Sequence, residues 1–281
     1  MARIVVVGSI ARDEVIRLAE PLIPGRHLNG IAAGARLGGG GANTAMALAA
    51  AGHEVTLVTA VGRDDHGDVL LAELVQAGVD VSAVARLDCP TTHSLILVDP
   101  GGERTVVNVA RCDEDAPPAR LLGLAADAVY VRSGRRDLAP LLEAKAASSL
   151  VLAHVPPVEN GSRPAHILVA SASDIGDETG GRALTLGRDI AGRSLRWFVL
   201  TAGAAGARAT SEEEVLEVRA EAVKTVDTTG AGDAFAAGLL HALVSGKPMA
   251  EALAVAVRFG TEATLWPTSA LPPAAVRGLV R

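Results

Sequence analysis

Residues 226–238 read VDTTGAGDAFAAG, a run of small turn residues that leads directly into an apolar helix. Gly230, Ala231 and Gly232 have almost no side chain, so their backbone N–H groups can approach a ligand closely. A helix that starts here adds partial positive charge at the same place. The stretch therefore predicts an anion-binding turn that suits a phosphate group in transfer, and we expect these three residues to take part in catalysis.

Asp233 falls in the first turn of this predicted helix. A phosphate site alone would gain nothing from a negative side chain, so a carboxylate here suggests a general base that acts on a nearby hydroxyl group. The alternative interpretation is structural: Asp233 caps the helix, and the glycines only make a tight turn.

A second glycine-rich stretch, GGGGANTAMALA at residues 38–49, also leads into a helix. Gly39 and Gly40 would let a sugar approach bare backbone, and the Asn43 amide can both donate to and accept from neighbouring hydroxyl groups. The structural alternative is a flexible loop with Asn43 as the helix cap.

The rest of the chain alternates short β-branched runs with longer Ala/Leu-rich stretches. This alternation predicts an α/β protein with a mostly parallel sheet covered by helices on both faces. The expected strands are 4–7, 55–61, 128–131, 150–153, 166–169 and 197–200, and the expected helices are 43–51, 67–77, 138–147, 233–245 and 249–263.

Two segments, 11–37 and 91–109, do not fit this rhythm. In the second segment, apolar runs flank DPGG at 99–102, which indicates a β-hairpin. A hairpin inserted into a parallel frame must lie outside the main sheet, so we interpret both segments as a small β lid over a site. No linker divides the chain, and we expect a single domain over residues 1–281.

The two glycine-rich stretches resemble the two signatures of the ribokinase-like (PfkB) carbohydrate kinases, and the resemblance runs from about Arg3 to Pro272. It implies a three-layer α/β/α fold with a small β lid. The implied activity is an ATP-dependent kinase that phosphorylates a hydroxymethyl group of a small sugar or nucleoside, with Asp233 as general base.

The resemblance also implies binding roles for residues outside the helix starts. Asp13, at the end of GSIARD (residues 8–13), would contact sugar hydroxyls together with Gly39, Gly40 and Asn43. The stretch LTAGAAG at 200–206 is similar to the family's nucleotide loop. The implied ATP-binding residues are Thr201, Gly203, Gly206, Thr229, Gly230 and Gly232.

Metal binding is the point at which the sequence departs from the family pattern. Where the family has Asn-x-x-Glu, this chain has Ser171 and Asp174. Mg²⁺ prefers oxygen ligands and keeps several waters, so Asp174 could serve through water. Resembling enzymes also bind a monovalent cation such as K⁺, here near Asp227. The departure at Ser171 motivates an alternative function, a weak or inactive kinase-like protein that binds a sugar or nucleotide.

Arg132, Arg135 and Arg136 cluster beyond the predicted strand 128–131. Ligands of open α/β sheets bind at such strand ends. We therefore count Arg135 as a candidate substrate-binding residue that could read an anionic or carboxylated acceptor. A solvated charged turn is the alternative.

Composition limits the partners. The net charge of −6 gives no global positive field to hold nucleic acid, and no window approaches the roughly 20 apolar residues of a membrane span. The 2 cysteines are too few for a disulfide framework, which fits a reducing cytoplasm. We expect a cytoplasmic protein with a small-molecule substrate and, from the family resemblance, a homodimer formed through the lid.

Overall fold

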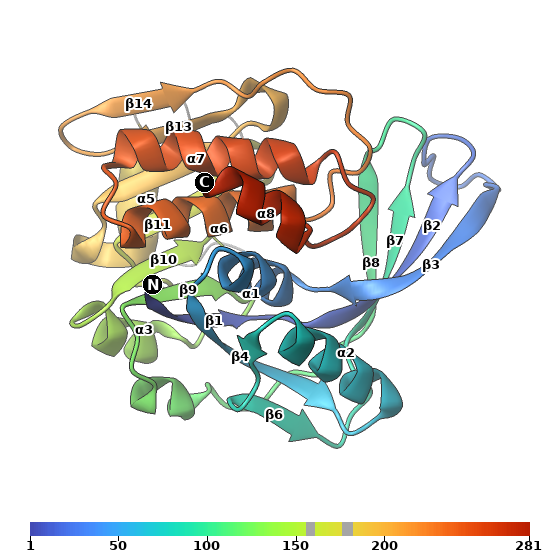
Figure 1. Cartoon of the computed structure of the whole chain (residues 1–281), viewed down its shortest axis with the longest axis horizontal. Coiled ribbons are helices and arrows are strands. Elements are labelled where there is room, and N and C mark those ends of the chain that lie inside the picture. The colour runs from blue at the N-terminus through green and yellow to red at the C-terminus, as the bar shows by residue number, and fades with distance from the viewer. Residues whose placement is uncertain (156–160, 176–181) are drawn as a thin grey trace.

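The computed structural model describes residues 1–155, 161–175 and 182–281, and it has two sheets (Figure 1). The larger sheet has ten strands within these residues, ordered β14-β13-β12-β11-β10-β9-β1-β4-β5, with β6 paired to β4. All neighbours from β12 to β5 are parallel, and only β13 and β14 add antiparallel pairs. Its strands are β1 (Arg3–Gly8), β4 (Glu54–Gly62), β5 (Val79–Asp80), β6 (Val84–Leu87), β9 (Ala128–Arg132), β10 (Leu150–His154), β11 (Ile167–Ser171), β12 (Trp197–Thr201), β13 (Ala207–Thr210) and β14 (Val215–Val218).

Helices cover both faces of this sheet because its strands are apolar on both sides. In β1, Ile4 and Val6 belong to one core cluster, whereas Val5 and Val7 belong to the other. The first cluster packs under α1 (Gly40–Ala50), α2 (Asp65–Gln76), α6 (Ala231–Val244), α7 (Met249–Ala263) and α8 (Pro273–Leu279). The second packs under η1 (Ala119–Gly123), α3 (Ala139–Ala146) and α5 (Ala183–Ala191). The predicted three-layer fold is confirmed.

Three short helical segments complete the described elements, and they follow β11, α5 and β12. They are α4 (Ala172–Ile175), η2 (Gly192–Ser194) and η3 (Gly203–Ala205). The first and third follow the carboxyl ends of β11 and β12, at the edge of the sheet where the site lies.

The two segments that break the βαβ rhythm form one separate sheet, which we call the small sheet. Its order is β3 (Gly30–Gly38), β2 (Ala11–Leu18), β7 (His93–Val98) and β8 (Arg104–Ala110). The β2–β7 pair is parallel, and the two outer pairs are antiparallel. The small sheet projects from one end of the molecule, at the right of Figure 1. Its own core cluster consists of Val15, Ile96 and Val98.

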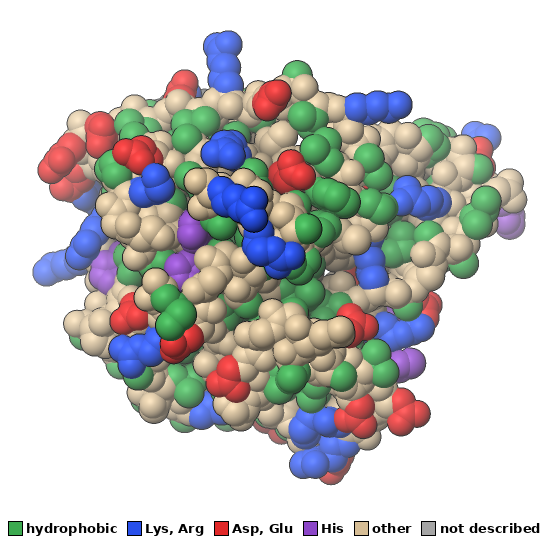
Figure 2. All heavy atoms as spheres, viewed as in Figure 1, with side chains coloured by type: hydrophobic (Ala, Val, Ile, Leu, Met, Phe, Trp, Pro, Cys, Tyr) green, Lys and Arg blue, Asp and Glu red, His purple; other side chains and the backbone are tan. Residues whose placement is uncertain are grey.

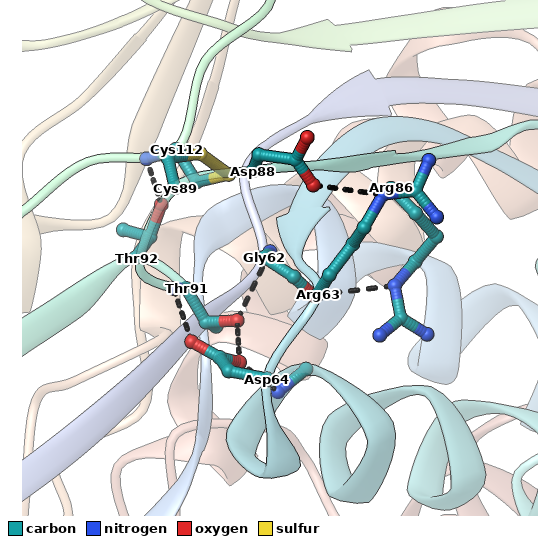
Figure 3. Close-up of a disulfide and its surroundings, with 10 residues drawn as sticks. Gly62, Arg63, Asp64, Arg86, Asp88, Cys89, Thr91, Thr92 and Cys112 are labelled. Carbon is teal, nitrogen blue, oxygen red and sulfur yellow. Dashed lines mark hydrogen bonds and ion pairs between the residues drawn. A yellow bond between two sulfur atoms is a disulfide. The ribbon is translucent and has the colours of Figure 1, made fainter.

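A disulfide joins the two cysteines, which corrects the expectation drawn from their number and spacing. Cys89 precedes β7 and Cys112 follows β8, and their Cα atoms lie 5.9 Å apart. The bond therefore ties together the two feet of the β7–β8 hairpin (Figure 3). Disulfides persist in oxidising surroundings, so the cysteines no longer argue for a reducing compartment.

Hydrogen bonds hold the same feet to the body of the protein. The Oγ1 of Thr92 accepts from the backbone N–H of Cys112 at 3.0 Å, and Asp64 accepts from the Thr91 N–H at 2.8 Å (Figure 3). Asp64 also caps α2 through the Gly67 N–H. The base of the hairpin is therefore fixed to the start of α2, next to the end of β4.

The exposed surface carries both signs of charge. On the face shown in Figure 2, Lys and Arg side chains are interspersed with Asp and Glu and form no continuous band. Among the described residues, no helix is both long and apolar enough to cross a membrane.

Candidate active site

The site lies at the carboxyl edge of the parallel strands, where open α/β sheets bind ligands. The last residues of five strands stand side by side along this edge. In spatial order they are Gly8 of β1, Arg132 of β9, His154 of β10, Ser171 of β11 and Thr201 of β12. The edge therefore runs from the predicted acceptor end at β1 to the predicted nucleotide end at β12.

Glycines bring the start of α1 directly onto the end of β1. A Cβ on Gly41 would lie 2.5 Å from the backbone carbon of Gly8, so side chains at this contact would force the two elements apart. Gly39, which precedes α1, has a φ of 92°, a conformation that L side chains rarely adopt. This local sequence places Gly40 and Asn43 at the strand edge.

A cavity of about 370 Å³ opens at this edge, between the helix starts and the inner face of the small sheet. Alternate residues of β2, β7 and β8 form its roof, because side chains of a strand alternate between two faces. Of the predicted site residues, the cavity lining includes Asp13, Gly39, Gly40, Asn43, Arg135, Thr229, Gly230 and Asp233. Sequence segments more than 200 residues apart therefore meet at one cavity.

Asp233 lies in the first turn of α6, and its side chain is only 9% exposed. Its Oδ2 accepts a hydrogen bond from Asn43 Nδ2 at 2.9 Å, and its Oδ1 accepts from Arg132 Nε at 3.3 Å. Each carboxylate oxygen keeps a lone pair for a further donor. The acid therefore faces the cavity and retains the capacity to accept a hydroxyl proton.

Among the residues that line the cavity, two buried side-chain atoms have no hydrogen-bond partner among the described residues. They are the Oδ1 of Asn43 and the Oγ1 of Thr229. A buried polar atom without a partner is costly, so such atoms point to a ligand that completes them. The Asn43 oxygen can accept one hydrogen bond, and the Thr229 hydroxyl can donate one.

The predicted anion-binding turn precedes α6. Gly230 has a φ of 78°, and a Cβ there would lie 1.7 Å from the carbonyl oxygen of Ser269, so a glycine is required at this position. Its helix has no side-chain cap; the Ala231 N–H donates to the Thr228 carbonyl at 3.3 Å, whereas the N–H groups of Gly232 and Asp233 have no acceptor among the described residues and are available to a ligand. Ala231 and Gly232 form the first turn, beside Asp233.

Asp227 stabilises this turn through a hydrogen bond and an ion pair. The carboxylate is fully buried, accepts from the Thr229 N–H at 2.8 Å and forms an ion pair with Arg36 at 3.1 Å. These contacts hold the pKa of Asp227 below its ordinary value, because they outweigh the effect of burial. Arg36 belongs to β3 and also donates to the carbonyl of Pro267, so the small sheet is bonded to the turn.

Asp13 lies on β2 with its carboxyl directed at the acceptor end. A Cβ on Gly38 would lie 1.8 Å from its Oδ2, so the side chain occupies the space that Gly38 leaves open. Burial raises the pKa of Asp13 to about 6, although the charge of Arg36 and a hydrogen bond from Ser269 act in the opposite direction. The acid is therefore ionised at neutral pH and titrates just below it.

Arg135 lines the cavity, but its guanidinium is bound within the protein. It donates to Asp137 at 2.9 and 2.6 Å and to the backbone carbonyl of Glu114. Arg132 lies closer to the predicted chemistry because it contacts Asp233 and packs on Gly40, where a Cβ would lie 2.6 Å from the Arg132 Cγ.

The predicted nucleotide loop lies outside the cavity lining, at the other end of the strand edge. Gly203 begins η3 after β12, and most of residues 202–205 are exposed. A glycine is required at position 206 for packing alone, because a Cβ there would lie 2.0 Å from the carbonyl oxygen of Val218. Thr201 donates to the carbonyl of Ala170 at 3.3 Å.

Asp174 lies in α4, three residues after the end of β11. This position is between the predicted nucleotide loop and the cavity. Its charge contributes to raising the pKa of Arg132, which places the two groups within electrostatic reach. Among the residues that the structure describes, no three His, Cys, Asp or Glu side chains are grouped as a metal site. A lone carboxylate suits a hydrated Mg²⁺ bound mainly by phosphate oxygens.

Sequence reasoning missed three contributors to the site. Arg36 pairs with Asp227, Arg104 donates to Thr228 at 3.2 Å, and Ser269 donates to Asp13 at 3.4 Å. Each contact spans more than 120 residues of sequence, and none of the three lies in a recognisable motif. Only the tertiary structure reveals them.

Comparison with known proteins gives relatives over nearly the whole chain. The ribokinase of Bacillus subtilis (strain 168) is 27% identical over 283 residues, covering 92% of this chain and 91% of the relative. The ATP-dependent ribose-1-phosphate kinase of Halopiger xanaduensis is 30% identical over 217 residues, covering 72% of each. Among solved structures, ribokinase from Giardia lamblia has a TM-score of 0.85 at 21% identity, covering 100% of this chain and 99% of that one.

A family model agrees with the geometry. The model described as pfkB family carbohydrate kinase matches residues 1–268, which include both glycine-rich helix starts, the small sheet and Asp233. The chain therefore belongs to the pfkB family of carbohydrate kinases.

Proposed function

We propose that the protein is an ATP-dependent kinase that transfers the γ-phosphoryl group to a hydroxymethyl group of a small sugar or nucleoside, with Asp233 as general base. One observation carries the proposal: the Asp233 carboxylate lines an acceptor-sized cavity and begins the same helix as the uncapped anion-binding turn. A base and an anion site adjacent on one helix are what phosphoryl transfer to an alcohol requires.

In the proposed reaction, the acceptor oxygen forms a bond to the γ-phosphorus as the bond between that phosphorus and the β–γ bridging oxygen breaks. ADP leaves with the electron pair of the broken bond, and the hydroxyl proton goes to Asp233. Asn43 and Asp13 orient the acceptor, because each offers an oxygen to its hydroxyl groups. The N–H groups of the turn stabilise charge on the transferred group.

Nucleotide and metal would bind at the β11–β12 end of the strand edge. Thr201, Gly203 and Gly206 would contact ATP, and Thr229 would donate to its terminal phosphate. Asp174 would hold Mg²⁺ through water, and the ion would neutralise phosphate charge. Both oxygens of Asp227 already accept hydrogen bonds, so a monovalent cation would share them with Arg36 and Thr229.

The small sheet would act as a lid that keeps water out during transfer. Its inner face forms the cavity roof, and its β7–β8 tip rests on the segment before the anion-binding turn, where Thr228 Oγ1 donates to the Gly102 carbonyl at 3.3 Å. Water competes with the acceptor for the phosphoryl group, so exclusion favours transfer.

Two further expectations, the monovalent cation and the homodimer, come first from the family resemblance, whereas the cytoplasmic location was inferred from the cysteine content and loses that support with the disulfide. The acceptor is a separate matter. The names of the relatives cover a neutral sugar, ribose, and a phosphorylated one, ribose 1-phosphate. The charge of the acceptor must therefore be argued from this chain's own cavity.

An acceptor screen tests the proposed function. The protein is incubated with ATP and Mg²⁺ and a panel of pentoses, hexoses, nucleosides and their acid and phosphate derivatives, and ADP release and thermal unfolding are both measured. We expect ADP release that depends on one class of acceptor. Thermal stabilisation by ligands without ADP release would instead support the binding protein that the Ser171 departure suggests.

A further inference from the structure

Four arginine side chains of the described residues line the cavity: Arg104, Arg111, Arg132 and Arg135. Arg135 is bound to Asp137 and the Glu114 carbonyl, so it has few donors left for a ligand. Arg104 donates to Thr228, beside the anion-binding turn, and so belongs to the nucleotide end. Arg111 and Arg132 remain for the acceptor end of the cavity.

Arg132 keeps unused donors on the cavity side. Its Nε donates to Asp233, and its Nη1 lies 3.4 Å from His154 Nδ1. Its Nη2 has no acceptor among the residues described. A guanidinium has five N–H donors in a fixed planar fork, so this group can bind Asp233 and a second anion together.

Arg111 has no hydrogen bond or ion pair with any described residue, although it lines the cavity. It follows β8 directly, and Arg135 connects its segment to the loop after β9 by donating to the Glu114 carbonyl. Arg111 and Arg132 each lie three residues before one member of this Arg135–Glu114 contact. Their segments therefore meet on one side of the cavity.

The cavity also carries four carboxylates, so the number of charges alone does not decide its preference. Asp233 is already paired with Arg132, and Glu114 is bound by both terminal nitrogens of Arg120 at 2.6 Å. Asp13 lies on β2 and accepts a hydrogen bond from Ser269 at 3.4 Å. Asp113 lies two residues after Arg111 and also lines the cavity. It is exposed and has no hydrogen bond or ion pair with any residue described.

We propose that the natural acceptor is an anionic sugar derivative, which carries a carboxylate or a phosphate in addition to its hydroxymethyl group, and that Arg111 and Arg132 bind this anionic group. The inference rests on the proposed function and specifies its substrate class. Arg132 would bridge the substrate anion and Asp233, so it would also offset the repulsion between these two negative groups. A neutral sugar would leave Arg111 without a charged partner, and Arg132 would keep only its pair with Asp233.

Two matched acceptor sets test the inference. One set is ribose, ribonate and ribose 1-phosphate, and the other is glucose, gluconate and glucose 1-phosphate; kcat and KM are measured for each by ADP release. We expect the anionic members to exceed their neutral partner in kcat/KM by at least tenfold. The ribonate and gluconate arms identify a carboxylate, and the sugar phosphate arms identify a phosphate.

Arginine variants identify the residues responsible. We expect Arg111→Gln and Arg132→Gln each to reduce the anionic advantage by about 10- to 100-fold, mainly through KM, since charge-assisted hydrogen bonds are lost. Arg132→Lys should restore part of the advantage. Arg136→Gln is the matched control, because Arg136 belongs to the same loop but does not line the cavity.

The comparison within each variant separates specificity from positioning. If Arg132 only orients Asp233, then Arg132→Gln lowers kcat for neutral and anionic acceptors equally, and the inference is wrong. A preference for a neutral sugar or nucleoside would also overturn it while leaving the kinase function intact. If no acceptor is phosphorylated, the binding of the same six compounds is measured by calorimetry. Tighter binding of the anions would support the anion preference although the proposed kinase function has failed. Equal or absent binding would overturn both proposals.

Discussion

Asp233 is the residue at which the acceptor and nucleotide ends meet. Asn43 and Arg132 each donate to one of its oxygens, so the carboxylate is held in one orientation while both oxygens keep a free lone pair. As the proposed base, a carboxylate held in this way would not need to reorganise when the acceptor hydroxyl arrives.

We expect Asp233→Asn to lower kcat by about 10²–10⁴, because an amide cannot take the hydroxyl proton. ATP binding should remain, since the N–H groups of the turn are unchanged. Steady-state kinetics and nucleotide titration measure the two effects. Asp65→Asn, which removes a first-turn acid of α2 instead, is the control, and near-normal turnover of Asp233→Asn would end the assignment of Asp233 as base.

If Asp13 binds the acceptor as proposed, its raised pKa predicts a pH dependence of acceptor binding. With its pKa at about 6, the carboxyl is charged at pH 7.5 and accepts hydroxyl hydrogen bonds, but it becomes protonated as the pH falls. We expect KM for the acceptor to rise about tenfold between pH 7 and pH 5, as for a single ionisation near 6. In Asp13→Asn, KM should be high and constant over this range, whereas a constant KM in the wild type would contradict the role of the ionised acid.

At the scale of elements, the β7–β8 hairpin connects the body of the protein to the acceptor cavity at both of its ends. Its feet are held by the Cys89–Cys112 disulfide, and its tip contacts the segment before the anion-binding turn. Between these ends, the hairpin contributes cavity residues such as Ser94 and Asn108.

The disulfide should stabilise the folded chain. It closes a loop with a sequence separation of 23, for which chain-entropy reasoning gives about 3 kcal/mol of unfolding free energy. We expect the double variant Cys89→Ser, Cys112→Ser to lose about this amount in urea denaturation. Dithiothreitol should destabilise the wild type and leave the double variant unchanged. Equal urea midpoints for the double variant and the wild type without dithiothreitol would show that the disulfide contributes nothing.

Shortening the hairpin tip near Gly101 should uncouple ATP hydrolysis from transfer. The tip turn is closed by Asp99, which accepts from the Gly101 and Glu103 N–H groups, and the deletion would remove its contact with Thr228. We expect the ratio of phosphate release to acceptor phosphorylation to rise. A matched deletion in the 211–214 turn between β13 and β14 serves as control, and an unchanged ratio would mean that the hairpin does not exclude water.

For the whole molecule, the small sheet is the part with the least core of its own. Only Val15, Ile96 and Val98 form its buried cluster, and both of its outer strands leave an edge unpaired within the described residues. On β3, Ile31 is 77% exposed. Exposed apolar strands of this kind favour association.

We therefore expect a homodimer of twice 28.5 kDa that forms through the small sheets. Sedimentation at micromolar concentration measures the mass, and Ile31→Glu should shift it to the monomer because a charge would be buried at the contact. Val75→Glu, on exposed α2, should leave it unchanged. A monomeric wild type would contradict the prediction.

The layers of the fold were predictable because they depend on local patterns. The helix 249–263 was predicted at its observed bounds, and α1 and α6 began two or three residues before their predicted starts because the glycines themselves join the helices. The edge pair β13–β14 was missed, since each of its strands has only 4 residues, too few to give a clear pattern in the sequence.

The candidate site could be predicted only in part, for a physical reason. Gly39, Asn43 and Asp233 lie in motifs whose local geometry defines their role, and the structure brings them together. The Arg36–Asp227 ion pair and the cysteine pairing depend instead on which loops approach in three dimensions. Spacing along the chain does not encode a Cα distance of 5.9 Å between Cys89 and Cys112.

Arg36 gives the closed form an energetic preference of its own. Moving β3 outward would leave the fully buried Asp227 charge without its counterion, and breaking a buried pair in this way costs about 3–5 kcal/mol. At equilibrium, the opened form would then account for on the order of one molecule in a thousand. If the small sheet opens as a lid to admit substrate, each opening would first require the Arg36–Asp227 ion pair to break, which makes Arg36 a latch on the proposed lid.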